Sequence, residues 1–251
     1  MNIFISNDDG IQAAGLKALA EALIPHHQVY IAAPEYQQSA KSHALTMHDI
    51  VHARRTHLYP GSAAEWAING TPADCVKIGL AKFEEIKFDL VLSGINNGPN
   101  LGIDVIYSGT VAAALEGSFH GIPSFAISHY SGAESGFRKA AEFIRDNLET
   151  LLSAFKWDYN AVNINFPPAD DYEGISYCKL GKMVYENSVQ RRTSPRGGEY
   201  YWIAGDLLIP PDQIDTDVYA ISRNRVSLTP IRFNFNDFHE PLIDSDQFKL
   251  D

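Results

Sequence analysis

The sequence has little cysteine, no excess of positive charge and no long hydrophobic run. Its two cysteines, Cys75 and Cys178, are too few for a disulfide framework, so we expect a reducing compartment and a cytoplasmic protein. No stretch is long and apolar enough to span a bilayer. The first ten residues lack a basic leader followed by an apolar segment, so we expect neither export nor membrane association.

The balance of charge is strongly acidic, with a formal net charge of −11 over 251 residues. Binding to a nucleic-acid polymer depends on many contacts between Lys or Arg and phosphate, so we expect no such partner. A small phosphorylated ligand remains possible, because one cation in a pocket can outweigh a diffuse negative field.

Two hydrophobic periods alternate along the first two thirds of the sequence. Short apolar stretches typical of buried strands are separated by stretches whose apolar residues recur every three or four positions, as on one face of a helix. Strands are predicted at 2–6, 28–33, 66–69, 88–93, 124–128 and 161–165, and helices at 16–23, 72–83, 110–119 and 137–151. Residues 40–62 predict irregular extended structure. This order predicts an α/β, Rossmann-like fold, in which helices flank a largely parallel sheet on both faces.

The pattern changes after Pro167 and Pro168. Residues 170–251 hold half of the chain's twelve tyrosines, few helical periods and turn signals such as Pro210-Pro211. We therefore expect a Rossmann-like core at 1–168 and a β-rich C-terminal region at 169–251. The C-terminal region is expected to carry an arm used in oligomer contacts.

Two adjacent carboxylates, Asp8 and Asp9, follow the first predicted strand. Asn, Asp and Gly are ordinary turn residues, so the motif alone also fits a plain polar turn. Its position at the carboxyl edge of the sheet, where open parallel sheets bind ligands, favours a site. Two neighbouring carboxylates repel one another, and a hard divalent cation relieves that repulsion.

Other polar residues follow the later strands. The stretch 94–102 holds three asparagines and three glycines; Asn97-Gly98 alternatively predicts a hairpin whose returning strand is 103–107. Ser108 and Thr110 begin the next helix, either as simple caps or as part of an anion site. Ser39 and His43 lie in a loop, and by themselves indicate no more than a solvated turn. Oxygen ligands without paired Cys or His favour Mg²⁺ or Mn²⁺ over structural zinc.

Several motifs together resemble the SurE survival-protein nucleotidases. They are SNDDG, QQSAKSHALT, GTPADCV, SGINNGPNLG, IYSGTVAAALEG, SPRGGEYYWIAG and TDVYAISRNRVSLTP, which cover most of the chain. The segment 203–215 looks shorter than in many relatives. The residues after Pro230 match no pattern.

The resemblance implies a homo-oligomeric phosphatase, a homodimer or homotetramer, acting on nucleoside 5′- and 3′-monophosphates and often on short polyphosphate. It implies one divalent cation per subunit. Asp8 and Asp9 would be catalytic and would bind the cation with Ser39 and Asn96; Asn100, Ser108 and Thr110 would hold phosphate.

These residues suggest direct hydrolysis, in which a water attacks phosphorus in line while Asp8 or Asp9 accepts its proton. His43 is a candidate for protonating the leaving group. One alternative is nucleophilic attack by an aspartate, although such enzymes commonly space their two aspartates one residue apart. Others are a nucleotide- or phosphate-sensing module without turnover and an oligomeric scaffold. A nicotinamide dinucleotide is not expected, because no strand leads into G-x-G-x-x-G.

Overall fold

The computed structural model describes residues 1–158, 160–168, 171–186, 188–203, 205–210 and 213–232. Pro211 of the predicted turn and residues 233–251 of the C-terminal region lie outside the described residues. Among the described residues, no helix combines the length and the apolar character that crossing a membrane requires.

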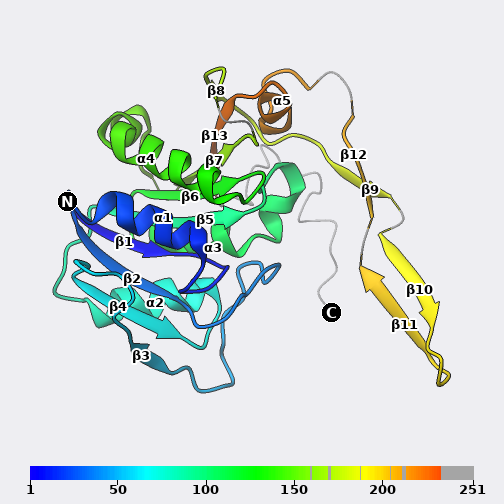
Figure 1. Cartoon of the computed structure of the whole chain (residues 1–251), viewed down its shortest axis with the longest axis horizontal. Coiled ribbons are helices and arrows are strands. Elements are labelled where there is room, and N and C mark those ends of the chain that lie inside the picture. The colour runs from blue at the N-terminus through cyan, green and yellow to red at the C-terminus, as the bar shows by residue number, and fades with distance from the viewer. Residues whose placement is uncertain (159, 169–170, 187, 204, 211–212, 233–251) are drawn as a thin grey trace, which may run out of the picture.

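A mostly parallel sheet forms the centre of the molecule (Figure 1). The strands β4, β2, β1, β5, β6 and β7 lie side by side and parallel. Their bounds are Ala64–Ile68, Gln28–Pro34, Asn2–Ser6, Leu90–Asn97, Ser124–His129 and Asn160–Phe166. Antiparallel strands β3 (Ala53–Arg55) and β13 (Val226–Arg232) lie next to β4 and β7, and β8 (Ile175–Tyr177) pairs with β13. The predicted α/β fold is confirmed.

Helices cover both faces of the sheet. On one face α1 (Ala14–Leu23) packs against α4 (Glu134–Ala154), and on the other α2 (Pro72–Lys82) packs against α3 (Gly109–Phe119). Each helix buries its apolar side in a hydrophobic core shared with the sheet. The start of α2 follows the predicted signals, because Thr71 and Asp74 form a reciprocal capping box around Pro72.

The stretch after β5 differs from the alternative hairpin. Residues Gly102–Ile106 form a 3-10 helix, η1, rather than a returning strand. Beyond Asn97 the chain instead runs toward β7, where the backbone N–H of Asn100 donates to the side chain of Asn165 at 2.8 Å. The hairpin alternative is therefore wrong, and the Asn- and Gly-rich stretch stays at the carboxyl edge of the sheet.

The C-terminal region both extends the sheet and leaves the body. Strands β8 and β13 belong to the central sheet, and the short helix α5 (Asp217–Ser222) precedes β13. Between them, β9 (Val184–Glu186) pairs with β12 (Asp206–Leu208), and β10 (Val189–Thr193) pairs with β11 (Glu199–Ile203). The β10–β11 hairpin stands away from the rest of the chain (Figure 1).

Candidate functional site

The strand order places a topological switch point between β1 and β5. From β1 the chain moves outward through β2 to β4 and then returns to β5 on the other side of β1. The pairing of Ser6 with Ser93 places the end of β1 beside the middle of β5, so that the last residues of β5 extend past it. Asp8 and Asp9 follow β1, and Asn96 lies near the end of β5. The predicted carboxylates thus lie in the crevice where open α/β sheets bind ligands.

Asp8 is a buried acid with one strong partner. Its side chain is 4% exposed, and the Thr110 hydroxyl at the start of α3 donates to Asp8 Oδ1 at 2.6 Å. Burial and the charge of Asp9 together raise the pKa of Asp8 to about 6, although hydrogen bonds from Thr110 lower it. A positive charge placed beside this carboxylate would reverse both unfavourable effects.

Asp9 is less buried and binds two neighbouring segments. The backbone N–H of Asn97 donates to Asp9 Oδ2 at 2.9 Å, and the Gln37 amide donates to Oδ1 at 3.3 Å. Burial raises the pKa of Asp9, while these two hydrogen bonds lower it. The Gln37 amide also donates to Ser39 Oγ at 3.0 Å. Gln37 thereby brings the predicted ligand Ser39 to the same side of the site as Asp9.

The side chain of Asn96 is oriented by its own loop. Its Nδ2 donates to the Gly98 carbonyl at 2.8 Å, and among the described residues its oxygen receives no hydrogen bond. The amide oxygen is therefore the atom that Asn96 can offer to a ligand.

Asn100 is held by side chains from β6 and β7. Its Nδ2 donates to Ser128 Oγ at 2.8 Å, and its carbonyl accepts from Asn163 at 2.7 Å and from Asn165 at 3.1 Å. Its backbone N–H is bound as well, to Asn165. All these partners are buried, so Asn100 is fixed rigidly at the carboxyl edge.

Ser108 and Thr110 have different partners. Ser108 is the N-cap of α3, where its Oγ accepts from the Val111 N–H at 3.1 Å. The Thr110 hydroxyl donates to Asp8, so its hydrogen is committed to the acid. Gly109, between them, lies against Asp8: a Cβ there would be 2.9 Å from Asp8 Cβ. The N-terminus of α3 therefore contacts Asp8 directly.

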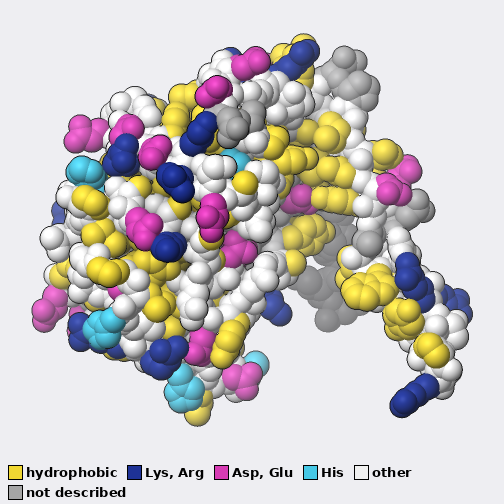
Figure 2. All heavy atoms as spheres, in the orientation of Figure 1, with side chains coloured by type: hydrophobic (Ala, Val, Ile, Leu, Met, Phe, Trp, Pro, Cys, Tyr) yellow, Lys and Arg dark blue, Asp and Glu magenta, His cyan; other side chains and the backbone are white. Residues whose placement is uncertain are grey.

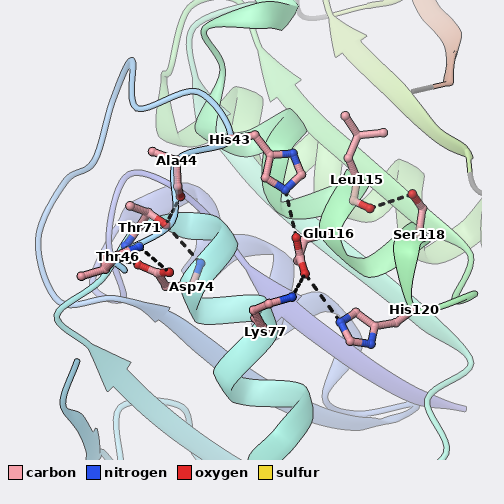
Figure 3. A network of polar contacts seen from close by, with 10 residues as sticks. All are labelled: His43, Ala44, Thr46, Thr71, Asp74, Lys77, Leu115, Glu116, Ser118 and His120. Atoms are coloured by element: carbon pink, nitrogen blue, oxygen red, sulfur yellow. Dashed lines mark hydrogen bonds and ion pairs between the residues drawn. The ribbon is translucent and has the colours of Figure 1, made fainter. Parts of the chain in front are cut away.

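His43 does not lie with these residues. Its Nε2 is 3.0 Å from Oε2 of Glu116, farther along α3 (Figure 3). The candidate for protonating the leaving group is therefore engaged by an acid of its own.

Gln37, Asn97 and Gly109 belong to the site but were not predicted from the sequence. Asn97 and Gly109 stand inside predicted motifs, so their position could have signalled them. The role of Gln37 depends on a loop conformation that no pattern in the sequence predicts.

The donor chemistry of the site fits a hard cation. Two adjacent carboxylates, a serine hydroxyl linked to Asp9 through Gln37 and an amide oxygen at the end of β5 are ligands that Mg²⁺ and Mn²⁺ accept. In the part of the chain that the structure describes, no three His, Cys, Asp or Glu side chains gather into a metal site. The set formed by Asp8, Asp9, Ser39 and Asn96 has only two such members, so its remaining ligands would be neutral oxygens.

Comparisons with known proteins agree with the fold and with the motifs. A family model described as "Survival protein SurE" matches residues 3–187. The chain is 44% identical to a 5′-nucleotidase SurE of Pelotomaculum thermopropionicum, over 95% of this chain and 92% of that protein. It is 41% identical to a 5′-nucleotidase SurE of Syntrophomonas wolfei, over 95% and 91%. The crystal structure of a SurE protein from Aquifex aeolicus superposes with a TM-score of 0.81 at 34% identity, covering 94% of this chain and 95% of that one.

Proposed function

The chain belongs to the SurE survival-protein family, and we propose that its paired-aspartate site hydrolyses nucleoside 5′-monophosphates to nucleoside and phosphate. The observation that carries the proposal is the position of Asp8 and Asp9 at the switch point of the sheet, where Asp8 contacts the N-terminus of α3. The relatives named 5′-nucleotidase support the same reaction.

We propose that one divalent cation per subunit, Mg²⁺ or Mn²⁺, binds to Asp8, Asp9, Ser39 and Asn96. When bound, the cation supplies positive charge that stabilises the charge developing on the phosphoryl group. The metal dependence is supported by the burial of Asp8 and by its repulsion with Asp9, which together raise the pKa of Asp8.

The protein's own residues then bind the phosphate and move a proton. The Ser108 hydroxyl and the first N–H groups of α3 would hold the phosphoryl oxygens, since a helix N-terminus favours an anion. Asn100, fixed by its partners on β6 and β7, would bind another phosphoryl oxygen. Thr110 would act mainly by orienting Asp8, to which it donates. One of the two carboxylates would accept the proton of the attacking water.

An apolar groove beside Asn100 suits the nucleoside part of the substrate. The groove has a volume of about 540 Å³, and its lining includes Pro99, Leu101, Tyr130 and Tyr185. Two of these residues flank Asn100 in the chain, so a ligand that reaches Asn100 with its phosphate could place its base among the aromatic rings. Activity on 3′-monophosphates and short polyphosphate belongs to the same proposal.

The β10–β11 hairpin supports a homo-oligomer. Every residue of both strands is exposed, including three neighbouring aromatic residues, Tyr200, Tyr201 and Trp202. Figure 2 shows such hydrophobic side chains on the arm, away from the body of the molecule. A two-stranded ribbon is only marginally stable by itself, so a second subunit is the expected cover. We propose that the protein forms a homodimer or homotetramer. We also propose that residues 1–168 form the catalytic core and that the protein is cytoplasmic.

Phosphate release from a panel of nucleoside monophosphates tests the function. We expect release that stops on chelation and returns with Mn²⁺ or Mg²⁺. The variant Asp8→Ala should lose turnover and keep its thermal unfolding temperature within a few degrees. Nucleotide binding without release, with every metal tried, would instead assign the chain to the sensing modules. A trapped phospho-aspartate would replace direct hydrolysis by nucleophilic attack.

A further inference from the structure

The predicted metal ligand Ser39 lies in a segment without regular structure. Residues 35–46 connect β2 to the stretch before β3, and Ser39 itself is exposed. Two residues close behind it, Ala40 and Ser42, have φ angles of 56° and 53°, in the left-handed region that side chains disfavour. This conformation costs free energy, so contacts elsewhere must stabilise it.

The segment is held on both sides of Ser39. Before it, the Gln38 N–H donates to the Asp8 carbonyl at 2.7 Å, and after it the contacts lie with other elements. Ser42 binds the turn before α3, through its N–H to the Tyr107 carbonyl at 2.9 Å and its hydroxyl to the Ile106 carbonyl at 2.7 Å. The Thr71 hydroxyl donates to the Ala44 carbonyl at 2.7 Å. Between these two attachments stands His43, whose partner is a charged side chain rather than a backbone group.

Glu116 joins three separate parts of the chain. It is 4% exposed, and its carboxylate lies 3.0 Å from His43 Nε2 in the segment and 2.7 Å from Lys77 Nζ on α2 (Figure 3). His120, one turn farther along the chain, is 3.6 Å away. The hydrogen bond with His43 is the largest cause that lowers the pKa of Glu116, to about 2, although burial opposes it. Glu116 is therefore a carboxylate at any neutral pH.

The partners of Glu116 also link it to the paired acids. Glu116 lies on α3, whose first turn carries Thr110 to Asp8. Lys77 lies on α2, whose first turn binds the segment through Thr71 and Asp74. His43 is stacked in parallel on Phe119 of α3, with 5.5 Å between ring centroids. Removing the carboxylate would therefore loosen the segment at a point four residues from Ser39 and leave the paired acids in place.

We propose that Glu116 is a positioning residue that fixes His43 and, through it, the segment carrying Ser39 against the metal site. The inference rests on the proposed role of Ser39 as a ligand. Glu116 touches neither Asp8 nor Asp9 in the structure, so it would act through the geometry of the segment and not by binding the cation itself.

Mn²⁺ binding to Glu116→Gln, measured by titration calorimetry without substrate, tests the proposal. Glutamine keeps the shape of the side chain but removes its charge. We expect the dissociation constant for Mn²⁺ to rise about three- to tenfold. This is less than the more than about tenfold effect of losing a whole charge-assisted hydrogen bond, because the other contacts of the segment remain. Amide hydrogen exchange of residues 38–46 should become faster. The matched control is Glu21→Gln, an exposed carboxylate on α1 that pairs with Lys17, and it should change neither quantity.

A second pair of variants keeps the test decisive if Glu116→Gln folds poorly. His43→Ala removes the same contact from the segment's side and should weaken Mn²⁺ binding to the same extent. His43→Gln, which retains a donor, should restore part of it. Wild-type Mn²⁺ affinity in both Glu116→Gln and His43→Ala would overturn this inference and leave the proposed function standing. Wild-type protein that binds no Mn²⁺ would overturn the proposed function and the inference with it.

Discussion

Gly109 and Gly117, both on α3, allow a matched test of how closely the helix must approach the paired acids. A Cβ atom added at Gly109 would lie 2.9 Å from Asp8 Cβ, and one added at Gly117 would lie 2.8 Å from Val91 Cβ. Both distances are shorter than ordinary van der Waals contact, which begins at 3.4 Å. The two alanine variants therefore overfill the interior to a similar degree, but only one of them presses on the site.

The expected effects on stability are similar. Overpacking costs about 1–3 kcal/mol, and the better helix propensity of alanine returns up to about 1 kcal/mol. For a chain of this size, either variant should unfold no more than about 10 °C below the parent. The expected effects on activity differ. Relief of the contact at Gly109 requires Asp8 to move by roughly 0.5 Å, and displacements of about 1 Å cost about a hundredfold in rate.

The assay is kcat/KM for a nucleoside 5′-monophosphate at saturating Mn²⁺, together with thermal unfolding of each variant. Gly109→Ala should lose about tenfold or more in kcat/KM, whereas Gly117→Ala should stay within about threefold of the parent. Equal activity of the two variants at equal stability would show that the approach of α3 to Asp8 does not set the geometry of the site.

Two further predictions follow from the same site. The pKa of Asp8 is raised from 3.8 to about 6 in the folded protein. Between these two values the folded protein therefore binds more protons than the unfolded chain. The stability of the metal-free protein falls as pH rises through this range and is level above it. In chelator, Asp8→Asn should therefore be more stable than the parent by up to about 3 kcal/mol at pH 7.5 and lose this advantage near pH 4; equal unfolding temperatures at pH 7.5 would contradict the argument. Tyr130→Ala should raise KM for a nucleoside monophosphate about fivefold or more and leave KM for methyl phosphate, which has no ring to place in the groove, unchanged, as steady-state kinetics with both substrates would show. A parallel rise for both substrates would exclude the groove as the nucleoside subsite.

Much of the fold was predictable because the spacing of apolar residues in the sequence matches the spacing of buried positions in strands and helices. The strand predicted at 2–6 coincides with β1, and the helix predicted at 110–119 with α3 to within one residue. The first turn of α2 was predictable for a local reason, since the capping box of Thr71 and Asp74 lies within four consecutive residues. The central position of β1 was not predictable, because strand order depends on pairings between segments far apart in the chain.

The residues of the candidate site also differ in whether a local sequence signal or a contact between distant segments places them. Asp8 and Asp9 could be singled out because they come soon after β1, and the carboxyl ends of parallel strands meet at one edge. Asn96 lies in a polar stretch at the same edge, but its role as a ligand was named only by resemblance. Ser39 could be named only by resemblance, since its place beside Asp9 depends on Gln37 and on a loop with left-handed residues. The bond from Thr110 to Asp8 escaped prediction because a helix-capping sequence does not indicate which distant side chain its hydroxyl meets.

The switch point between β1 and β5 also determines at which stage of folding the two acids, Asp8 and Asp9, are buried together. Asp9 meets Asn97 across 88 residues of chain, and Asp8 meets Thr110 across 102. Such contacts form only after long loops have closed, so a nascent chain that has paired β1 with β2 still carries both acids open to water. Their mutual repulsion arises when β5 and α3 dock, late in assembly. A cation that binds only the docked state would then leave the folding rate nearly unchanged and slow unfolding, so that metal occupancy governs how long the finished molecule survives.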